Sequence, residues 1–336
     1  MWESIIGHHH IITMLQGMLT KGSLPHALIL AGPAGVGKGL TAHALAAAIL
    51  CGRTHPCGSC PNCTALARQS HAGFFRILPD GNVIKIDQIR ALQHEAGLGA
   101  ATGSRVCIME DAEKMTLQAA NSLLKLLEEP PDGFYFILLT SSPHALLGTV
   151  RSRCVTLKFL PLTADILAQA LADNGHDEDH SMLAARLSGG RLGKALGLLE
   201  PNGLARRDEA LQIICAVTQQ QSNWFFPLVS RLDKRPAGEI QELLRYMTVM
   251  FRDIMILQTT GSQALLYNTD CLDELQRTAG LWPHNAPPAA VRSVRAADRA
   301  LAANANSRLT LEGLLIALAD MAKEENRDAN RRRNTL

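Results

Sequence analysis

The first half of the chain alternates short apolar runs with longer stretches whose apolar residues recur every three or four positions. Runs that are apolar throughout are typical of strands buried on both faces of a parallel sheet, and the periodic stretches are typical of covering helices. The runs predict strands over Ala27–Ala31, Phe75–Leu78, Val106–Met109, Phe134–Leu139 and Val155–Phe159. The periodic stretches predict helices over Gly39–Leu50, Ile86–Leu98 and Thr116–Leu127. The fold class is therefore expected to be α/β, with a five-stranded parallel sheet.

The strand pattern stops after Pro161, and every later segment has helical spacing. The stretch Pro201–Gly203, with its Pro-Asn-Gly sequence, is the best candidate for a linker. We therefore expect an α/β domain over 1–161, a small helical unit over 162–203, a larger helical domain over 204–325 and a charged tail over 326–336.

Charge and hydropathy exclude several classes of protein. The 336 residues contain 33 Lys and Arg against 31 Asp and Glu, a net charge of +2, and only 4% are aromatic. Such a chain does not coat nucleic acid or anionic membrane by bulk charge, and it offers few rings for base stacking. No apolar run is long enough to span a membrane, and the first residues lack the features of a signal peptide. We expect a cytoplasmic protein, in which the triplet His8–His10 is solvated rather than metal-binding.

A glycine-rich loop follows the first predicted strand and leads into a helix, which is the setting of a phosphate-binding loop. Backbone N–H groups of such a loop cradle phosphate, and its lysine reaches the outer phosphates. Gly39 stands where the motif has the Ser or Thr that ligates Mg²⁺, and Thr41 is poorly placed to replace it. The alternative is a glycine-rich turn without a ligand. The candidate nucleotide-binding residues here are Gly32, Pro33, Ala34, Gly35, Val36, Gly37, Lys38 and Gly39.

Two carboxylates, Glu110 and Asp111, end the third predicted strand. In P-loop ATPases this place usually holds Asp, which binds the metal, followed by Glu, which orients water. Here the order is reversed, and the side chain of Asp111 is one methylene shorter than the usual water-orienting residue. A misplacement of about 1 Å can cost roughly a hundredfold in rate. The alternative is that Asp111 or Thr116 only caps the next helix.

Four of the eight cysteines lie within thirteen residues, spaced Cys-x5-Cys-x2-Cys-x2-Cys. Four thiolates at such spacing can close a tetrahedral shell around a structural Zn²⁺. An iron–sulfur cluster and a patch of free thiols are the alternatives. The predicted zinc ligands are Cys51, Cys57, Cys60 and Cys63, and the predicted core cysteines are Cys107, Cys154, Cys215 and Cys271.

The order of these motifs resembles that of a known family. The loop, the cysteine insertion and the acidic strand end are followed by the string AANSLLKLLEEPP at Ala119–Pro131 and by Ser152-Arg153-Cys154. Together they resemble the clamp-loader subunits of bacterial DNA polymerase III, a branch of the AAA+ ATPases, strongly over residues 1–200. Gly39, the Glu110-Asp111 order and the chain length favour the delta-prime branch of that family over the gamma/tau branch.

The resemblance implies a fold, a set of partners and further site residues. It implies an AAA+ domain with a helical lid and a helical collar domain. It also implies a role in loading the sliding clamp onto primed DNA, beside gamma/tau and delta subunits, as a non-polymerising component of the DNA polymerase holoenzyme. Arg153 matches the arginine finger that reaches ATP on a neighbouring subunit, and Thr140 or Ser141 matches the sensor of the γ-phosphate. A local ion pair of Arg153 with Glu128 or Glu129 is the alternative for that arginine.

Hydrolysis of ATP by this chain itself is expected to be weak or absent. Besides Gly39 and the reversed carboxylates, Gly193 stands where the second sensor of the family has arginine, with Arg191 and Lys194 as neighbours. Two other functions stay open at this point: an active gamma/tau-like clamp-loader ATPase, and a zinc-containing nucleic-acid-binding module with a relic phosphate loop. The near-zero net charge argues against the second.

Overall fold

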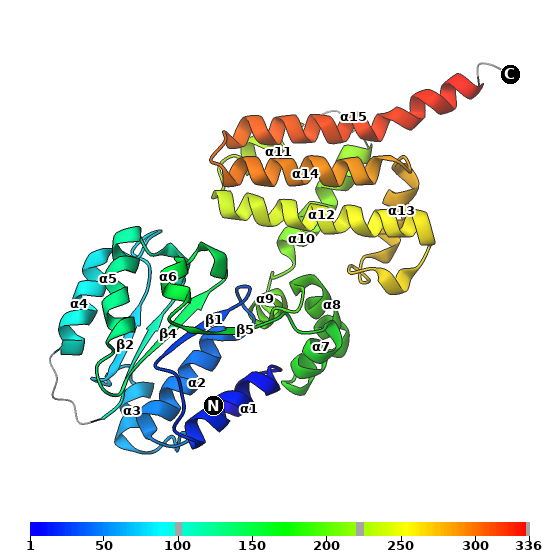
Figure 1. Ribbon diagram of the computed structural model, residues 1–336. Helices are drawn as coiled ribbons and strands as arrows, with labels where there is room; N and C mark the ends of the chain where they lie inside the picture. Colours follow the sequence, from blue (N-terminus) through cyan, green and yellow to red (C-terminus); the bar gives the residue numbers. More distant parts are fainter. Residues whose placement is uncertain (98–102, 220–224, 334–336) are drawn as a thin grey trace. The chain divides into compact units, whose positions relative to one another are not determined.

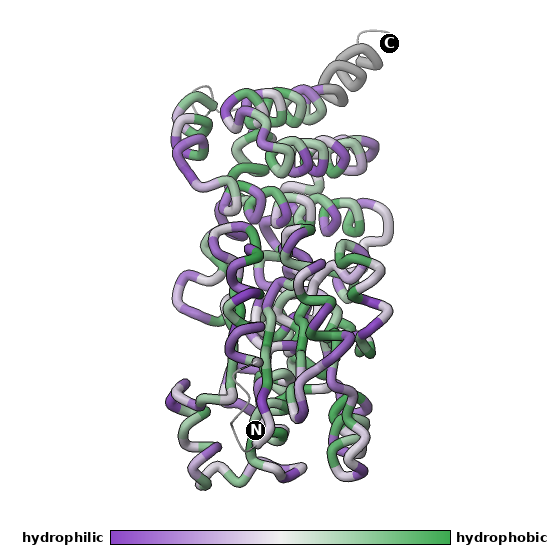
Figure 2. Tube along the Cα trace, turned by 60° about the vertical axis from the view of Figure 1, so that its left-hand side comes forward, coloured by the Kyte–Doolittle hydropathy of each residue, from purple (hydrophilic) through white to green (hydrophobic). Residues whose placement is uncertain are grey.

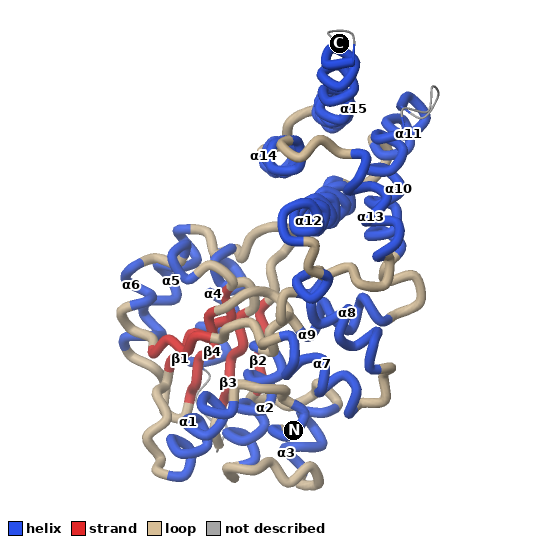
Figure 3. The backbone as a smooth tube through the Cα atoms, turned by 90° about the vertical axis from the view of Figure 1, so that its right-hand side faces the viewer, coloured by secondary structure: helices blue, strands red, loops and turns tan. Residues whose placement is uncertain are grey.

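The computed structural model describes residues 1–97, 103–219 and 225–333. The chain divides into two compact units, Met1–Leu196 and Gly197–Leu336. Figure 3 shows that the strands all lie in the first unit, whereas the described part of the second unit consists of helices and loops. Among the described residues no helix is both long enough and apolar enough to cross a bilayer.

The first unit is built on a five-stranded sheet with the order β2-β3-β4-β1-β5 (Figure 1). All neighbouring strands are parallel, with Ala31 opposite Thr140 and Met109 opposite Leu138. The predicted parallel sheet is confirmed, and each strand ends within one residue of its expected bounds. The strands are β1 (Ala27–Ala31), β2 (Phe74–Ile77), β3 (Arg105–Met109), β4 (Phe134–Thr140) and β5 (Val155–Lys158).

Helices cover both faces of this sheet, as Figure 1 shows. Alternation along β1 sends Leu28 and Leu30 to the cluster that includes α1 and α2, and Ile29 to the opposite cluster with α4, α5 and α6. The predicted end of α4 at Leu98 lies outside the described residues. The helices of this layer are α1 (His9–Thr20), α2 (Lys38–Cys51), α3 (Pro61–Ala67), α4 (Ile86–Gly97), α5 (Leu117–Glu128) and α6 (Gly148–Arg151), with short turns η1 (Trp2–Ser4), η2 (Ala112–Lys114) and η3 (Pro143–Ala145).

Three helices follow the sheet: α7 (Ala164–Asp173), α8 (Glu178–Ser188) and α9 (Leu192–Leu199). Side-chain caps begin the first two, because Thr163 accepts a hydrogen bond from the backbone of Ile166 and Asp177 accepts one from His180. The two compact units join within α9, whereas the sequence placed the linker at Pro201–Gly203.

The second unit has only helices as regular secondary structure over its described residues. Its longest fully described helix, α12, packs against α10, α13 and α14. Along these helices the hydropathy alternates between green and purple in Figure 2, as expected for helices with one buried face. The last helix continues through Arg333, beyond residue 326 where the charged tail was expected to begin. The elements are α10 (Ala205–Gln219), α11 (Phe225–Leu232), α12 (Ala237–Thr260), η4 (Gln263–Leu265), α13 (Leu272–Leu281), α14 (Ala286–Ala302) and α15 (Ser307–Arg333).

A buried carboxylate anchors the loop between α12 and α13. Asp253 is fully buried and accepts hydrogen bonds from the backbone N–H groups of Tyr267 and Asn268, at 3.1 and 2.9 Å. Arg252 donates to the other carboxylate oxygen at 2.7 Å and lies over the Tyr267 ring. Since the Asp253 carboxylate would otherwise be an unpaired charge in the interior, these hydrogen bonds tie the loop to α12.

Candidate functional site

The phosphate-binding loop lies where the sequence predicts it, between the end of β1 and the start of α2. Gly32 is required by close packing, because a Cβ there would stand 2.3 Å from the backbone oxygen of Phe159. Gly37 has a φ of +102°, in the left-handed region that favours glycine. These positions let the chain turn sharply into the helix, and the first residues of that helix line a pocket.

This pocket has a volume of about 350 Å³ and lies entirely within the first unit. Its walls come from the phosphate loop, the acidic end of β3, the end of β4 and the start of α9. It gathers most of the predicted loop residues with both predicted carboxylates at the carboxyl ends of the strands, where open parallel sheets bind ligands. The lining residues are Ala34, Gly35, Gly37, Lys38, Gly39, Leu40, Glu110, Asp111, Leu139, Leu192, Gly193 and Leu196.

Lys38 folds back over the loop. Its Nζ donates hydrogen bonds to the backbone oxygens of Gly32 at 2.5 Å and Pro33 at 2.8 Å. Burial lowers the pKa of Lys38, and the charges of Glu113 and Asp111 oppose that shift. The ammonium group therefore lies between the loop carbonyls and the acidic edge of the sheet.

No hydroxyl of the first helical turn is available for a metal. The Thr41 side chain is buried and donates to the backbone oxygen of Gly37 at 3.0 Å. Gly39 lines the pocket, and a Cβ at this position would have no atom within 4 Å. Packing therefore does not require glycine at position 39, and its effect is to remove the usual Mg²⁺ ligand.

Both predicted carboxylates are held by cations of the chain itself. Glu110 pairs with Arg76 of β2 at 2.7 Å, and Asp111 pairs with Lys114 at 2.9 Å. Asp111 makes no cap hydrogen bond, whereas Thr116 caps α5 by accepting from the backbone of Ala119 at 3.2 Å. The capping alternative thus describes Thr116 and not Asp111.

Glu113 is a site residue that the sequence analysis missed. Its carboxylate accepts hydrogen bonds from the backbone and the hydroxyl of Ser141, at 3.0 and 2.5 Å. Burial alone would raise the pKa of Glu113, but hydrogen bonds from Ser141 and Thr140 outweigh burial and hold it below its ordinary value. Thr140 is itself buried, and its Oγ1 accepts from the backbone of Ser142. The signal in the sequence was a third acidic residue, three positions after Glu110.

The lid and the N-terminal segment both contact the phosphate loop. Gly193 of α9 donates its backbone N–H to the backbone oxygen of Gly35 at 3.0 Å. On the other side, the Nε2 atom of His8 lies 2.9 Å from the backbone oxygen of Val36, and its ring packs on Phe159. The expectation that the whole histidine triplet is solvated is therefore wrong for His8, which is half-buried because it packs against the loop.

Arg153 lies just after α6 and does not line the pocket of its own chain. Its guanidinium pairs with Glu128 at 2.5 Å and donates to the backbone oxygen of Thr149 at 2.9 Å. The side chain is 35% exposed. The ion pair between Arg153 and Glu128 that the sequence offered as an alternative is thus present, and the Arg153 side chain is nevertheless accessible to solvent.

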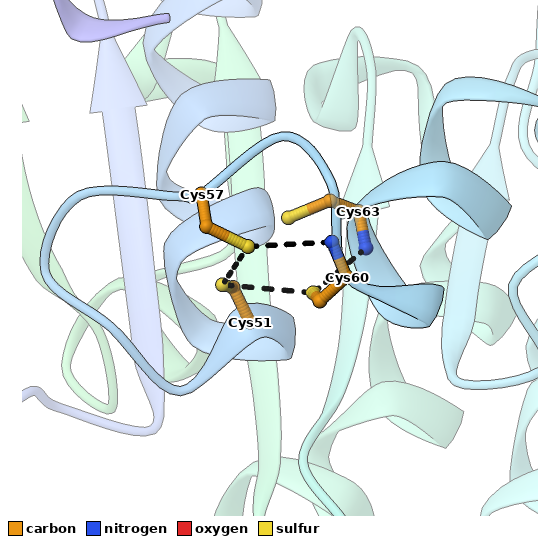
Figure 4. Close-up of side chains that lie close together, drawn as sticks. All are labelled: Cys51, Cys57, Cys60 and Cys63. Carbon is orange, nitrogen blue, oxygen red and sulfur yellow. Dashed lines mark hydrogen bonds between the residues drawn. The ribbon is translucent and has the colours of Figure 1, made fainter.

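The four clustered cysteines converge at the end of α2 and the start of α3 (Figure 4). All four Sγ atoms lie within 4.8 Å of one another, and the Cys51–Cys57 and Cys51–Cys60 pairs stand 3.7 and 3.8 Å apart. Thiolates about 2.3 Å from a tetrahedral zinc would stand about 3.8 Å apart. The backbone of Cys60 donates to Cys57 Sγ and that of Cys63 donates to Cys60 Sγ. These residues therefore fit a closed Zn²⁺ site.

The isolated cysteines have a different environment. Cys107 is buried in β3, and burial raises its pKa to about 12. Cys154, Cys215 and Cys271 are half-buried rather than fully in the core. The prediction of core cysteines is thus confirmed for Cys107, and Cys154 packs against the edge of the same core cluster.

Comparison with known proteins finds that the chain is similar to subunits of DNA polymerase III. A model of the DNA polymerase III delta subunit family matches residues 7–163. The chain is 29% identical to DNA polymerase III subunit delta' of Bacillus subtilis, over 92% of this chain and 95% of that protein. It is 37% identical to the delta' subunit of Pseudomonas aeruginosa, over 56% of this chain and 59% of that protein.

A solved structure agrees with this fold. The gamma subunit-related protein of DNA polymerase III from Thermotoga maritima matches with a TM-score of 0.50 and 19% identity, over 93% of this chain and 99% of that one. The likeness supports the fold alone, whereas the sequence matches confirm the family resemblance. The chain is therefore similar to DNA polymerase III delta-prime subunits, over most of its length in the case of the Bacillus subtilis protein.

Proposed function

We propose that this chain is a clamp-loader subunit that assists ATP hydrolysis on a neighbouring subunit more than it hydrolyses ATP itself. Its partners are gamma/tau and delta subunits, the sliding clamp and primed DNA. The family supports the clamp-loader role. The assistance to a neighbouring subunit is inferred from the position of Arg153. This side chain is partly exposed and lies outside the pocket of its own chain.

A guanidinium placed in this way can act in trans. Its planar fork matches the charge that develops on a transferring phosphoryl group, and such a finger is worth about 10³–10⁵ in rate in related systems. The chain's own pocket supports weak turnover, because Gly39 supplies no hydroxyl and both strand-end carboxylates are paired.

The cysteine cluster is assigned to a structural zinc. Four thiolates leave no open position for a substrate, so Zn²⁺ would tie the end of α2 to the start of α3 and would not take part in chemistry. The cytoplasmic location inferred from the sequence stays a prediction.

Reconstitution of the loader tests the proposed role. Loader assembled with wild-type chain, Arg153→Ala or Arg153→Lys is compared for DNA-stimulated ATP hydrolysis and clamp loading. Arg151→Ala is the matched control, because Arg151 is a neighbouring arginine whose partner in this structure is His144. We expect both Arg153 variants to lose hydrolysis at the site that the chain serves, since lysine lacks the fork. Unchanged hydrolysis in Arg153→Ala would contradict the role.

The isolated chain provides the second test. Brisk ATP turnover by the purified chain, abolished by Lys38→Ala, would instead favour the active gamma/tau-like ATPase. We expect turnover near background in both proteins, because the metal ligands are missing or occupied.

A further inference from the structure

We propose that the pocket beside the phosphate loop binds a nucleoside polyphosphate without Mg²⁺, because the chain's own cations occupy the place of the metal. The proposal deepens the proposed function and depends on it only for the assignment of this pocket to a nucleotide. It concerns how the pocket balances charge, which neither the family nor the missing hydroxyl determines.

The residues present do not fit a magnesium ion. Mg²⁺ requires nearly octahedral oxygen ligands and gives up its waters reluctantly. Position 39 offers no side-chain oxygen, and the Thr41 hydroxyl donates its hydrogen bond to the backbone of Gly37. Of the two strand-end carboxylates, Glu110 lies 2.7 Å from Arg76 and Asp111 lies 2.9 Å from Lys114. An incoming ion would therefore have to displace a resident cation to gain either one.

The charges at this edge also balance without a metal. The carboxylates of Glu110, Asp111 and Glu113 contribute three negative charges, and Arg76, Lys114 and Lys38 contribute three positive ones, so the sum is zero. Glu113 and Asp111 both act on Lys38, and Lys114 pairs with Asp111, so these four groups form one connected set beside the separate Arg76–Glu110 pair. Attraction of a divalent cation depends on excess negative charge, and the protein side of this edge supplies none before a nucleotide enters.

The parts that hold phosphate do not depend on the metal. Loop N–H groups and the first turn of α2 are backbone donors, and the Lys38 ammonium is held at the pocket wall by two loop carbonyls. A polyphosphate that enters would replace those two carbonyls as the acceptor for Lys38. The pocket volume of about 350 Å³ is of the size that small-molecule sites have.

The ion pairs are individually weak, which makes the proposal testable by substitution. The side chains of Arg76 and Glu110 are 42% and 30% exposed, and exposed pairs of this kind contribute little to stability. Removing Arg76 therefore uncovers Glu110 without unfolding the chain. A threonine at position 39 is sterically allowed, because a Cβ there meets nothing within 4 Å.

The experiment measures the affinity of the full-length chain for a fluorescent ATP analogue by anisotropy, with and without Mg²⁺. The metal-free buffer contains no chelator, so that the cysteine site keeps its zinc. The proteins are wild type, the double variant Arg76→Gln/Gly39→Thr, Lys38→Ala, and Arg90→Gln. Arg90→Gln is the control because Arg90 forms an exposed pair with Asp87, away from the pocket.

For the wild type and Arg90→Gln, we expect dissociation constants that agree within about twofold with and without Mg²⁺. In the double variant Mg²⁺ should tighten binding by about tenfold or more, the equivalent of about 1.4 kcal/mol. Lys38→Ala should weaken binding under both conditions. A tenfold effect of Mg²⁺ on the wild type, a double variant indifferent to Mg²⁺, or no binding of the analogue by wild type in either buffer would each overturn the proposal.

The two proposals fail separately. If Arg153→Ala left ATP hydrolysis by the reconstituted loader unchanged while the isolated chain bound nucleotide independently of Mg²⁺, only the proposed action of Arg153 on a neighbouring subunit would be overturned. If the isolated chain instead bound nucleotide only with Mg²⁺ while Arg153→Ala still reduced hydrolysis by the loader, only the proposal of nucleotide binding without Mg²⁺ would be overturned.

Discussion

Release of Arg153 from Glu128 offers a quantitative test of the proposed role of Arg153 as an arginine finger. In the isolated chain the two groups stand 2.5 Å apart, yet their side chains are 35% and 49% exposed. Ion pairs this exposed are worth about 0–1 kcal/mol, because water and salt screen them and holding two long side chains costs entropy. Glu128→Gln should therefore increase the fraction of free Arg153 by at most about fivefold.

This fivefold increase in free Arg153 is small compared with the rate enhancement of about 10³–10⁵ that an arginine finger provides in related systems. Single-turnover ATP hydrolysis by the reconstituted loader should rise by about one- to fivefold with Glu128→Gln. The increase should shrink at higher ionic strength, because the Debye length falls. Glu129→Gln is the matched control, since Glu129 is the adjacent exposed carboxylate and Arg153 pairs with Glu128.

A loss of hydrolysis in Glu128→Gln comparable to that of Arg153→Ala would refute this reasoning. It would mean that Glu128 positions the arginine for the reaction, so that the ion pair belongs to the working site.

Three further predictions concern stability. Cys63→Ser should lower the zinc content below one per chain and lower the melting temperature of the first unit, as measured by elemental analysis and calorimetry, because one of four thiolates is lost. Asp253→Ala should destabilise the second unit by about 3–5 kcal/mol in urea denaturation, because it leaves Arg252 and two backbone N–H groups without their acceptor; Asp253→Asn, which keeps an acceptor oxygen, should cost less. Burial lowers the pKa of His8, so the unfolded chain binds its proton more readily, and the stability that neutral His8 contributes should be lost as pH falls below about 6.5. Denaturation at a series of pH values gives the free energy of unfolding as a function of pH. This free energy should depend less steeply on pH in His8→Gln than in the wild type, and an unchanged pH dependence would contradict this cause.

The sheet was predictable because its signal is local. Each central strand is a continuous apolar run, and the glycine-rich loop and the four-cysteine spacing also lie within one short stretch of sequence. For the same reason the bounds of β1 were predicted without error, from five successive apolar residues that are all buried.

The arrangement around the pocket depends instead on contacts between distant residues. Arg76 and Glu110 are 34 positions apart and meet because β2 and β3 are neighbours in the sheet. Glu113 and Ser141 are 28 positions apart, and they meet because β4 lies beside β3. The same holds for His8, which helical periodicity placed in solvent and which instead contacts the loop 28 positions later. Spacing along the chain carries no information on which cation a given carboxylate will find.

The reason for the proposed weak binding of Mg²⁺ consequently differs between the sequence and the structure. From the sequence, the cause is a single missing hydroxyl at position 39, which implies that Gly39→Thr alone would restore Mg²⁺ binding. The structure adds a second cause, since Arg76 already neutralises the carboxylate that the metal would need. If both causes act, neither Gly39→Thr nor Arg76→Gln alone should recover the full Mg²⁺ dependence of the double variant, because a metal ion needs the hydroxyl and the free carboxylate together.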